Sequence, residues 1–247
     1  MRNELRAEIA LAENLGAGEL RVDGLTVKRG DLTVCRDVTL AVPSGEITVL
    51  LGANGAGKTT LLEGIAGVLP AASGTISLDG HRIHTSPPHR RAARGLASVE
   101  QGRTVFSKLT VAQNLAVVDR SRQARERAFE LFPRLSGKQN MRAGLLSGGE
   151  QQMLIIARAL ATQPKVLLVD ELSLGLAPRT VQTLMEALVS LAASGMGILL
   201  VEQFAEMALQ IGTTAHIMQR GRIVETESCE ALLRDRGSRI RDAFFGE

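Results

Sequence analysis

The chain has 247 residues, 45% of them hydrophobic and 22% charged, with a formal net charge of +3. These values are typical of a globular domain with a sizeable core, and they exclude disordered and collagen-like chains. No run approaches the roughly 18 apolar residues of a membrane-spanning helix. Residues 1–18 lack the apolar stretch of a secretory signal, and Cys35 and Cys229 form no CxxC pair, so we expect reduced cytosolic thiols.

Nucleic-acid binding is not expected. The net charge is small, and the aromatic residues are six Phe with neither Trp nor Tyr, which leaves few side chains on which bases could stack. Basic residues cluster at 89–94 and 120–127, and we expect each cluster to be a solvated helix face.

In chain order, residues 1–19 are predicted to be a loosely attached N-terminal extension. From Leu20 onward, short apolar segments alternate with longer helical stretches, which predicts an α/β fold with a mainly parallel sheet. Strands covered on both faces are rich in Val, Ile and Leu, and four such runs are predicted to be buried strands: 47–51, 96–99, 166–169 and 198–201. The alternative, buried helix fragments, is disfavoured because the runs are short.

Glycine, acidic and amide residues follow these four runs directly. In parallel sheets, ligands bind beyond the carboxyl ends of the strands. We therefore expect one converging site, made by the residues after each strand in turn: Gly52, then Glu100 and Gln101, then Asp170 and Glu171, then Glu202 and Gln203.

The first of these turns fits G-x-x-x-x-G-K-[ST], the phosphate-binding loop. In such a loop the backbone N–H groups and the following helix N-terminus surround the phosphates. Lys58 would neutralise the β- and γ-phosphates, and the Thr59 hydroxyl would hold Mg²⁺. The alternative is a glycine-rich turn without a ligand, which the strand before and the helix after disfavour. The predicted nucleotide-binding residues here are Gly52, Ala53, Asn54, Gly55, Ala56, Gly57, Lys58, Thr59 and Thr60.

Two carboxylates after the third run supply the other half of a nucleotide site. Asp170 is predicted to hold Mg²⁺, and Glu171 to orient and deprotonate an attacking water. The alternative is that both residues cap the next helix.

The segment LSGGEQQ at 146–152 predicts a second helix start. Ser147 and Glu150 have the spacing of a capping box for a buried helix that runs to about residue 162. Gly148 and Gly149 would leave the first amides of that helix open to an anion. A well-capped core helix is the plain alternative. Because one phosphate loop already serves the nucleotide, a second anion site would be useful to another subunit.

With these motifs in this order and spacing, the sequence resembles the nucleotide-binding domains of ABC transporters from Leu20 to the C-terminus. The resemblance implies a P-loop NTPase fold with a mainly parallel core sheet, an antiparallel β subdomain and a helical subdomain at about 102–161. It implies ATP and Mg²⁺ as cofactors and a head-to-tail dimer with a second cassette, either a paralogue or a second copy. Each ATP would lie between Lys58 of one chain and Ser147, Gly148 and Gly149 of the facing chain.

The resemblance also gives roles to isolated residues. Gln101 matches a glutamine that senses Mg²⁺ near the coupling surface, and Gln203 stands where most relatives have the histidine that touches the γ-phosphate. Arg29 stands where an aromatic side chain usually stacks on adenine; it could stack there or be a solvated surface residue. Leu172 and Glu100 replace usual prolines, so less rigid loops are expected.

A finer resemblance is to the LivF type of ATP-binding protein from branched-chain amino-acid importers, carried by the segments 102–106, 130–135 and 173–178. It implies membrane permease subunits, an indirect solute-binding partner and a peripheral location at the cytoplasmic face of the membrane. Importers of urea share part of the pattern. Two other classes remain as alternatives: a non-transport ABC ATPase and a regulatory module that binds ATP without hydrolysing it.

Overall fold

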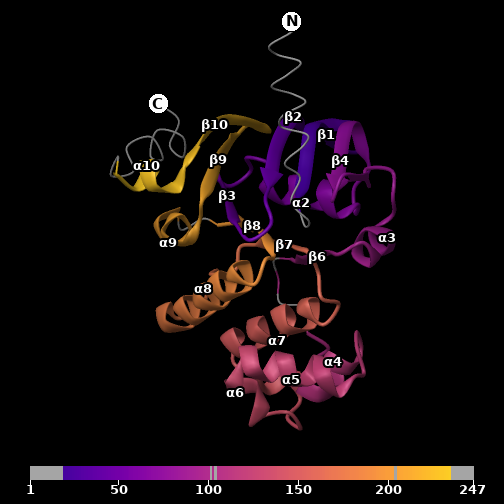
Figure 1. Ribbon diagram of the computed structural model, residues 1–247, viewed down its shortest axis with the longest axis vertical. Helices are drawn as coiled ribbons and strands as arrows, with labels where there is room; N and C mark the ends of the chain where they lie inside the picture. Colours follow the sequence, from indigo (N-terminus) through magenta and orange to yellow (C-terminus); the bar gives the residue numbers. More distant parts are fainter. Residues whose placement is uncertain (1–18, 101, 103–104, 203–204, 235–247) are drawn as a thin grey trace, which may run out of the picture.

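The computed structural model describes residues 19–100, 102, 105–202 and 205–234, and their strands form two sheets (Figure 1). The larger sheet has the order β10-β9-β3-β8-β7-β6, and the smaller has the order β2-β1-β4-β5. In the larger sheet β9, β3, β8, β7 and β6 run parallel, and β10 pairs antiparallel with β9. This mixture confirms the expected α/β fold with a mainly parallel core sheet.

The core sheet contains all four of the strands predicted from apolar runs. Every residue of β3, β7 and β8 is buried, as expected for parallel strands covered on both faces. The strands of this sheet are β3 (Ile47–Leu51), β6 (Leu96–Val99), β7 (Val166–Asp170), β8 (Gly197–Val201), β9 (Thr214–Gln219) and β10 (Arg222–Ser228).

The antiparallel sheet covers one face of the core sheet. Alternate core-strand residues, such as Leu50, Leu168 and Leu199, share a cluster with residues of this sheet and with Leu61 and Ile65 of helix α2. Helix α2 contacts strands of both sheets, so it is buried between them. The elements of this layer are β1 (Leu20–Arg29), β2 (Leu32–Val42), β4 (Ala71–Leu78), β5 (His81–Arg82) and α2 (Lys58–Ala66).

Helices cover the opposite face of the core sheet. Val49, Leu167 and Leu200 share a second cluster with residues of α7, α8 and α9. Helices α4 to α7 gather at one end of the molecule, away from the antiparallel sheet (Figure 1). The helices are α3 (Pro88–Ala93), α4 (Val111–Ala116), α5 (Arg122–Leu131), α6 (Pro133–Ser136), α7 (Gly148–Leu160), α8 (Pro178–Ala193), α9 (Ala205–Ile211) and α10 (Cys229–Arg234), with a 3₁₀ turn at Ala143–Leu145.

Two predicted parts of the chain are the N-terminal extension and the helical subdomain. The predicted extension at 1–19 lies almost wholly outside the described residues, and the boundary of the helical subdomain at about 102–161 stays a prediction. Across the ranges described above, no helix is both long and apolar enough to cross a bilayer.

The expectation that residues 89–94 form a solvated basic face is wrong at Arg91. This side chain is 2% exposed. Its guanidinium donates to the carbonyls of Gly64 and Ile65 in the last turn of α2, at 2.8 and 2.7 Å, and to those of Ser86 and His84, each at 2.8 Å. Four carbonyl acceptors compensate the loss of water, so this charge can be buried. Arg91 thereby fixes the C-terminal end of α2.

Candidate functional site

The glycine-rich turn joins β3 to the N-terminus of α2, as predicted. Gly57 is the N-cap residue, with the left-handed φ of 107° that glycine adopts without steric cost. This helix start has no hydrogen bond from a side chain of its N-cap residue. Its first N–H groups are therefore open to an anion.

The carbonyls of the same turn are held by neighbouring segments. Gly221, in the turn between β9 and β10, donates its N–H to the Ala56 carbonyl at 2.9 Å. The Cys35 thiol of β2 donates to the Gly57 carbonyl at 3.4 Å. These two bonds anchor the turn to β2 and to the turn between β9 and β10.

The Lys58 ammonium lies over this turn. The side chain is 5% exposed, and Nζ donates to the carbonyls of Gly52 at 2.7 Å and Ala53 at 3.1 Å. Burial lowers the pKa of Lys58, while the nearby Glu171 and Asp170 act to raise it. A buried cation held by two neutral carbonyls is well placed to exchange them for phosphate oxygens, which bind it more strongly.

Asp170 ends β7 and faces Thr59 at the start of α2. It is 3% exposed, and burial raises the pKa of this carboxyl, partly offset by a hydrogen bond with the Thr59 hydroxyl. Its Oδ1 atom is buried without a hydrogen-bond partner among the described residues. A free carboxylate oxygen beside a threonine hydroxyl is the donor set that Mg²⁺ takes when phosphates and waters supply its other ligands. The residues therefore fit this ion.

This pair opens on a small cavity of about 150 Å³, which Glu100 and Glu63 also line. In the described parts of the chain, no group of three or more His, Cys, Asp or Glu side chains is arranged to hold a metal. The convergence predicted at this edge of the sheet is confirmed for Asp170 and Glu100.

Glu171 has an unusual backbone. Its φ is 46°, a left-handed conformation that costs a non-glycine residue about 1–3 kcal/mol and is common at functional sites. Its N–H donates to the Val201 carbonyl of β8 at 2.9 Å. The N-cap of α8 is Ala177, without a side-chain cap. The alternative that Asp170 and Glu171 cap the next helix is therefore wrong.

Glu171 lies with the glycine-rich turn in a cavity of about 460 Å³, here called the phosphate-loop cavity. This cavity brings together most of the residues predicted at 52–60, the loop after β7 and the end of β1. Its lining residues are Arg29, Val34, Asn54, Gly55, Gly57, Lys58, Thr59, Thr60, Glu171 and Leu174.

Two alternatives were open for Arg29, stacking on adenine or lying as a solvated surface residue, and the structure matches neither completely. Its side chain is 49% exposed, but Nε donates to the Thr60 hydroxyl at 3.0 Å and the guanidinium forms an ion pair with Glu63. It is therefore anchored to α2 at the rim of the phosphate-loop cavity. Its use in stacking on a base stays a prediction.

The capping box at the start of α7 is confirmed. Ser147 Oγ accepts from the Glu150 N–H at 3.4 Å, and Glu150 Oε2 accepts from the Ser147 N–H at 3.0 Å. The helix ends at Leu160, two residues before the predicted end. A Cβ atom at Gly149 would lie 2.2 Å from Thr180 Cγ2, so close packing against α8 requires glycine here. Residues 147–149 do not line the phosphate-loop cavity.

Gln101 and Gln203 lie outside the described residues, and their predicted roles stay predictions. The residues that precede them differ: Glu100 is exposed, whereas Glu202 is buried and bonded to Ser173. Leu172 is also buried, at 1% exposure. The segment after Glu171 is therefore packed and hydrogen-bonded, and the lower rigidity expected from the absent proline stays a prediction.

The match to known proteins extends over nearly the whole chain. A family model described as ABC transporter matches residues 35–173. BraG of Pseudomonas aeruginosa, named a high-affinity branched-chain amino acid transport ATP-binding protein, is 42% identical over 233 residues, which cover 92% of this chain and 99% of BraG. A probable branched-chain amino acid transport ATP-binding protein LivF of Archaeoglobus fulgidus is 35% identical, covering 87% of this chain and 94% of LivF.

A third relative is named for a different role. LptB of Haemophilus influenzae, a lipopolysaccharide export system ATP-binding protein, is 36% identical over 87% of this chain and 91% of LptB. Among solved structures, a nucleotide-free ATP-binding cassette from an ABC transporter has a TM-score of 0.84 at 24% identity, covering 92% of this chain and 99% of that one, which shows a shared fold. An ATP-binding subunit of an ABC transporter has a TM-score of 0.77 at 27% identity, covering 88% and 93%.

Proposed function

The chain belongs to the ABC transporter family of ATP-binding proteins, and from that premise we propose that it is the ATP-hydrolysing subunit of an importer for branched-chain or related amino acids. The observation that carries the choice of solute is the similarity to BraG, which extends over 99% of that protein at a higher identity than LptB reaches. The cargo need not touch this chain, so it leaves no imprint in the phosphate-loop cavity.

In this proposal the triphosphate of ATP occupies the turn at 52–59. The open N–H groups at the start of α2 bind phosphate oxygens, and Lys58 leaves the Gly52 and Ala53 carbonyls to pair with the β- and γ-phosphates. Thr59 and Asp170, with Gln101, would hold Mg²⁺, which neutralises charge on the phosphates when bound. The unpartnered Asp170 Oδ1 atom supports this assignment.

Hydrolysis requires a base beside the γ-phosphate, and we assign this role to Glu171. Its carboxylate lines the same cavity as Lys58 and Thr59, and its backbone is held by β8 in a left-handed conformation. From this position it can orient a water and accept its proton. Gln203 would donate a hydrogen bond to a γ-phosphate oxygen.

A second cassette would complete the site by placing its own Ser147, Gly148 and Gly149, or their counterparts, over the phosphates. Two exposed leucines support such an interface. Leu145, two residues before Ser147, is 74% exposed, and Leu174, on the rim of the phosphate-loop cavity, is 48% exposed. In this proposal the second cassette would cover both side chains and remove their apolar surface from water.

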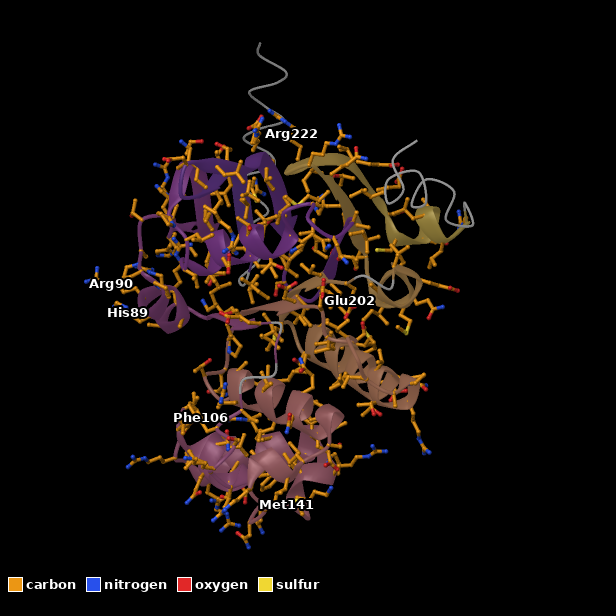
Figure 2. The ribbon with its side chains drawn as sticks, turned by 180° about the vertical axis from the view of Figure 1, so that it is seen from behind. His89, Arg90, Phe106, Met141, Glu202 and Arg222 are labelled. Atoms are coloured by element: carbon orange, nitrogen blue, oxygen red, sulfur yellow. The ribbon has the colours of Figure 1, made fainter. Side chains whose placement is uncertain are left out.

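The membrane subunits have a candidate docking groove of about 400 Å³ on another side of the molecule. It lies between α3, β6 and α7, and apolar residues such as Val68, Val118 and Ile155 line it. Arg158 of α7, which also lines the groove, stacks 4.9 Å above the ring of Phe106, a residue that is 44% exposed. In Figure 2 Phe106 lies on the same side of the molecule as His89, a further lining residue. Docking here would place the chain at the cytoplasmic face of the membrane.

The direct test of hydrolysis is Glu171→Gln. This variant keeps the size and polarity of the side chain but cannot take a proton from water. We expect at least a 100-fold loss of steady-state ATP turnover, with ATP binding and ATP-driven association retained. Turnover like that of the wild type would remove Glu171 as the base.

The solute is tested in vesicles that contain the chain with its membrane subunits and solute-binding protein. We expect ATP-dependent uptake of leucine, isoleucine or valine, whereas uptake of urea alone would contradict the amino-acid assignment. Export of a lipid in place of import would do so as well.

A further inference from the structure

Glu202 is a buried carboxylate for which the proposed function has no use. It follows the last residue of β8 and is 1% exposed. Figure 2 shows it in the middle of the molecule, at the level of the core sheet. Glutamate is rarely buried this completely unless hydrogen-bond donors compensate the loss of water.

Both donors of one residue, Ser173, compensate this carboxylate. The Ser173 N–H donates to Glu202 Oε1 at 3.0 Å, and the Ser173 hydroxyl donates to Oε2 at 2.5 Å. Ser173 itself is 4% exposed. Two short bonds to a carboxylate, shielded from water, fix the relative position of residues that are 29 apart in sequence.

The same bonds fix the segment that carries the proposed base. Glu171 lies two residues before Ser173, and its own N–H donates to the carbonyl of Val201, the residue before Glu202. Consecutive residues at the end of β8 therefore hold both ends of the segment 171–173. Leu172 between them is buried.

The conformation of Glu171 explains why such a hold is needed. A left-handed φ of 46° is unfavourable for glutamate and persists only where the surroundings enforce it. If Ser173 were released, the segment could relax toward an ordinary conformation, and the Glu171 carboxylate would turn with it.

We propose that Glu202 is a positioning residue for ATP hydrolysis: through its two bonds to Ser173 it holds the segment after Glu171 and thereby directs the Glu171 carboxylate into the phosphate-loop cavity. The inference rests on the proposed function, because it presumes that Glu171 is the base. In this role Glu202 acts on Glu171 through Ser173 and is not itself the base.

The test compares four single variants and one double variant with the wild-type chain in steady-state ATPase assays, and ATP affinity is measured separately with a fluorescent nucleotide. Ser173→Ala removes the hydroxyl donor, Ser173→Thr retains it, and Glu202→Gln removes the charge. Thr48→Ala is the matched control, because it also deletes a buried hydroxyl donor, one that bonds the Ala41 carbonyl of β2 at 3.1 Å.

We expect kcat to fall about tenfold or more in Ser173→Ala and Glu202→Gln, because small misplacements of a catalytic group are costly. The KM for ATP and the affinity for the nucleotide should stay within about twofold of wild type, since the phosphate-binding turn is untouched. Ser173→Thr should keep at least about half of the wild-type kcat, and Thr48→Ala should match wild type. The double variant Ser173→Ala/Glu202→Gln should be no slower than the slower single variant, since both changes break one link.

Three results would overturn the inference. One is an unchanged kcat in both Ser173→Ala and Glu202→Gln, and another is a loss of ATP affinity in proportion to the loss of kcat. The third is a loss of kcat in Ser173→Thr and Thr48→Ala as large as the loss in Ser173→Ala. These outcomes differ from failure of the proposed function, which would appear as a wild-type chain without ATPase activity or as a fully active Glu171→Gln variant.

Discussion

His216 makes the stability of this protein depend on pH, and the size of the effect follows from its surroundings. The residue lies in β9, between β3 and β10, and is 5% exposed. Its Nδ1 atom lies 2.8 Å from the Thr226 hydroxyl. Burial lowers the pKa of this imidazole from 6.5 to about 4.

The direction of this pH dependence follows from which state of the chain, folded or unfolded, binds the proton at residue 216. Between pH 6.5 and about 4 the unfolded chain takes up a proton at residue 216 that the folded chain does not, so the free energy of unfolding falls as the pH falls. From pH 7.5 to pH 4.5 the loss from this one group is about 2.5 kcal/mol. His216→Leu removes the titrating group and costs about 1 kcal/mol at pH 7.5 through the lost contact with Thr226.

Urea unfolding of both proteins at pH 7.5, 6.0, 5.0 and 4.5 measures the effect, because the other titrating groups are common to both. As the pH falls from 7.5 to 4.5, we expect the wild-type protein to lose about 2.5 kcal/mol more unfolding free energy than His216→Leu loses. Parallel pH profiles for the two proteins would refute the assignment of a neutral, buried imidazole.

Two further substitutions, Gly221→Ala and Asp170→Asn, test the phosphate-binding turn and the proposed Mg²⁺ site, and Gly80→Ala is the control for the first. A Cβ atom at Gly221 would lie 1.9 Å from the Val34 carbonyl oxygen at a φ of +82°, so Gly221→Ala should destabilise the chain by about 2–3 kcal/mol in urea unfolding. Gly80→Ala, at a φ of +72° with no atom within 4 Å, should cost only about 1 kcal/mol; equal losses would contradict the steric reasoning. Asp170→Asn should raise the Mg²⁺ concentration for half-maximal ATPase activity at least about tenfold, and an unchanged requirement would remove Asp170 from the Mg²⁺ site.

Local sequence patterns predicted the strands, turns and helix caps that depend on interactions between residues close in sequence. The strand Ile47–Leu51 is apolar at four of its five positions and is buried on both faces, and the turn after it needs glycines at fixed spacing. The capping box of Ser147 and Glu150 likewise depends on residues three apart. These features could be predicted because the interactions that produce them lie within a few residues.

The features that sequence reasoning missed join distant segments. Arg91 looked like part of a solvated basic face, but its acceptors include the carbonyls of Gly64 and Ile65, more than 20 residues away. The bonds between Glu202 and Ser173 connect loops after different strands. Polar residues at neighbouring strand ends indicated that these loops would meet, but not which side chains would bond. Only the packed fold determines such partners.

We propose that a working site needs Lys58 from one chain and Ser147 from a facing chain, and mixing two inactive variants tests this directly. Lys58→Ala removes the phosphate-binding cation, and Ser147→Arg blocks the start of α7; circular dichroism should show both variants folded, since the lost cap costs only about 1 kcal/mol. Each variant alone should be inactive. An equal mixture should recover about a quarter of wild-type ATPase activity, because half of the randomly formed dimers carry one intact site. A mixture that associates in the presence of ATP and still shows no turnover would contradict the claim.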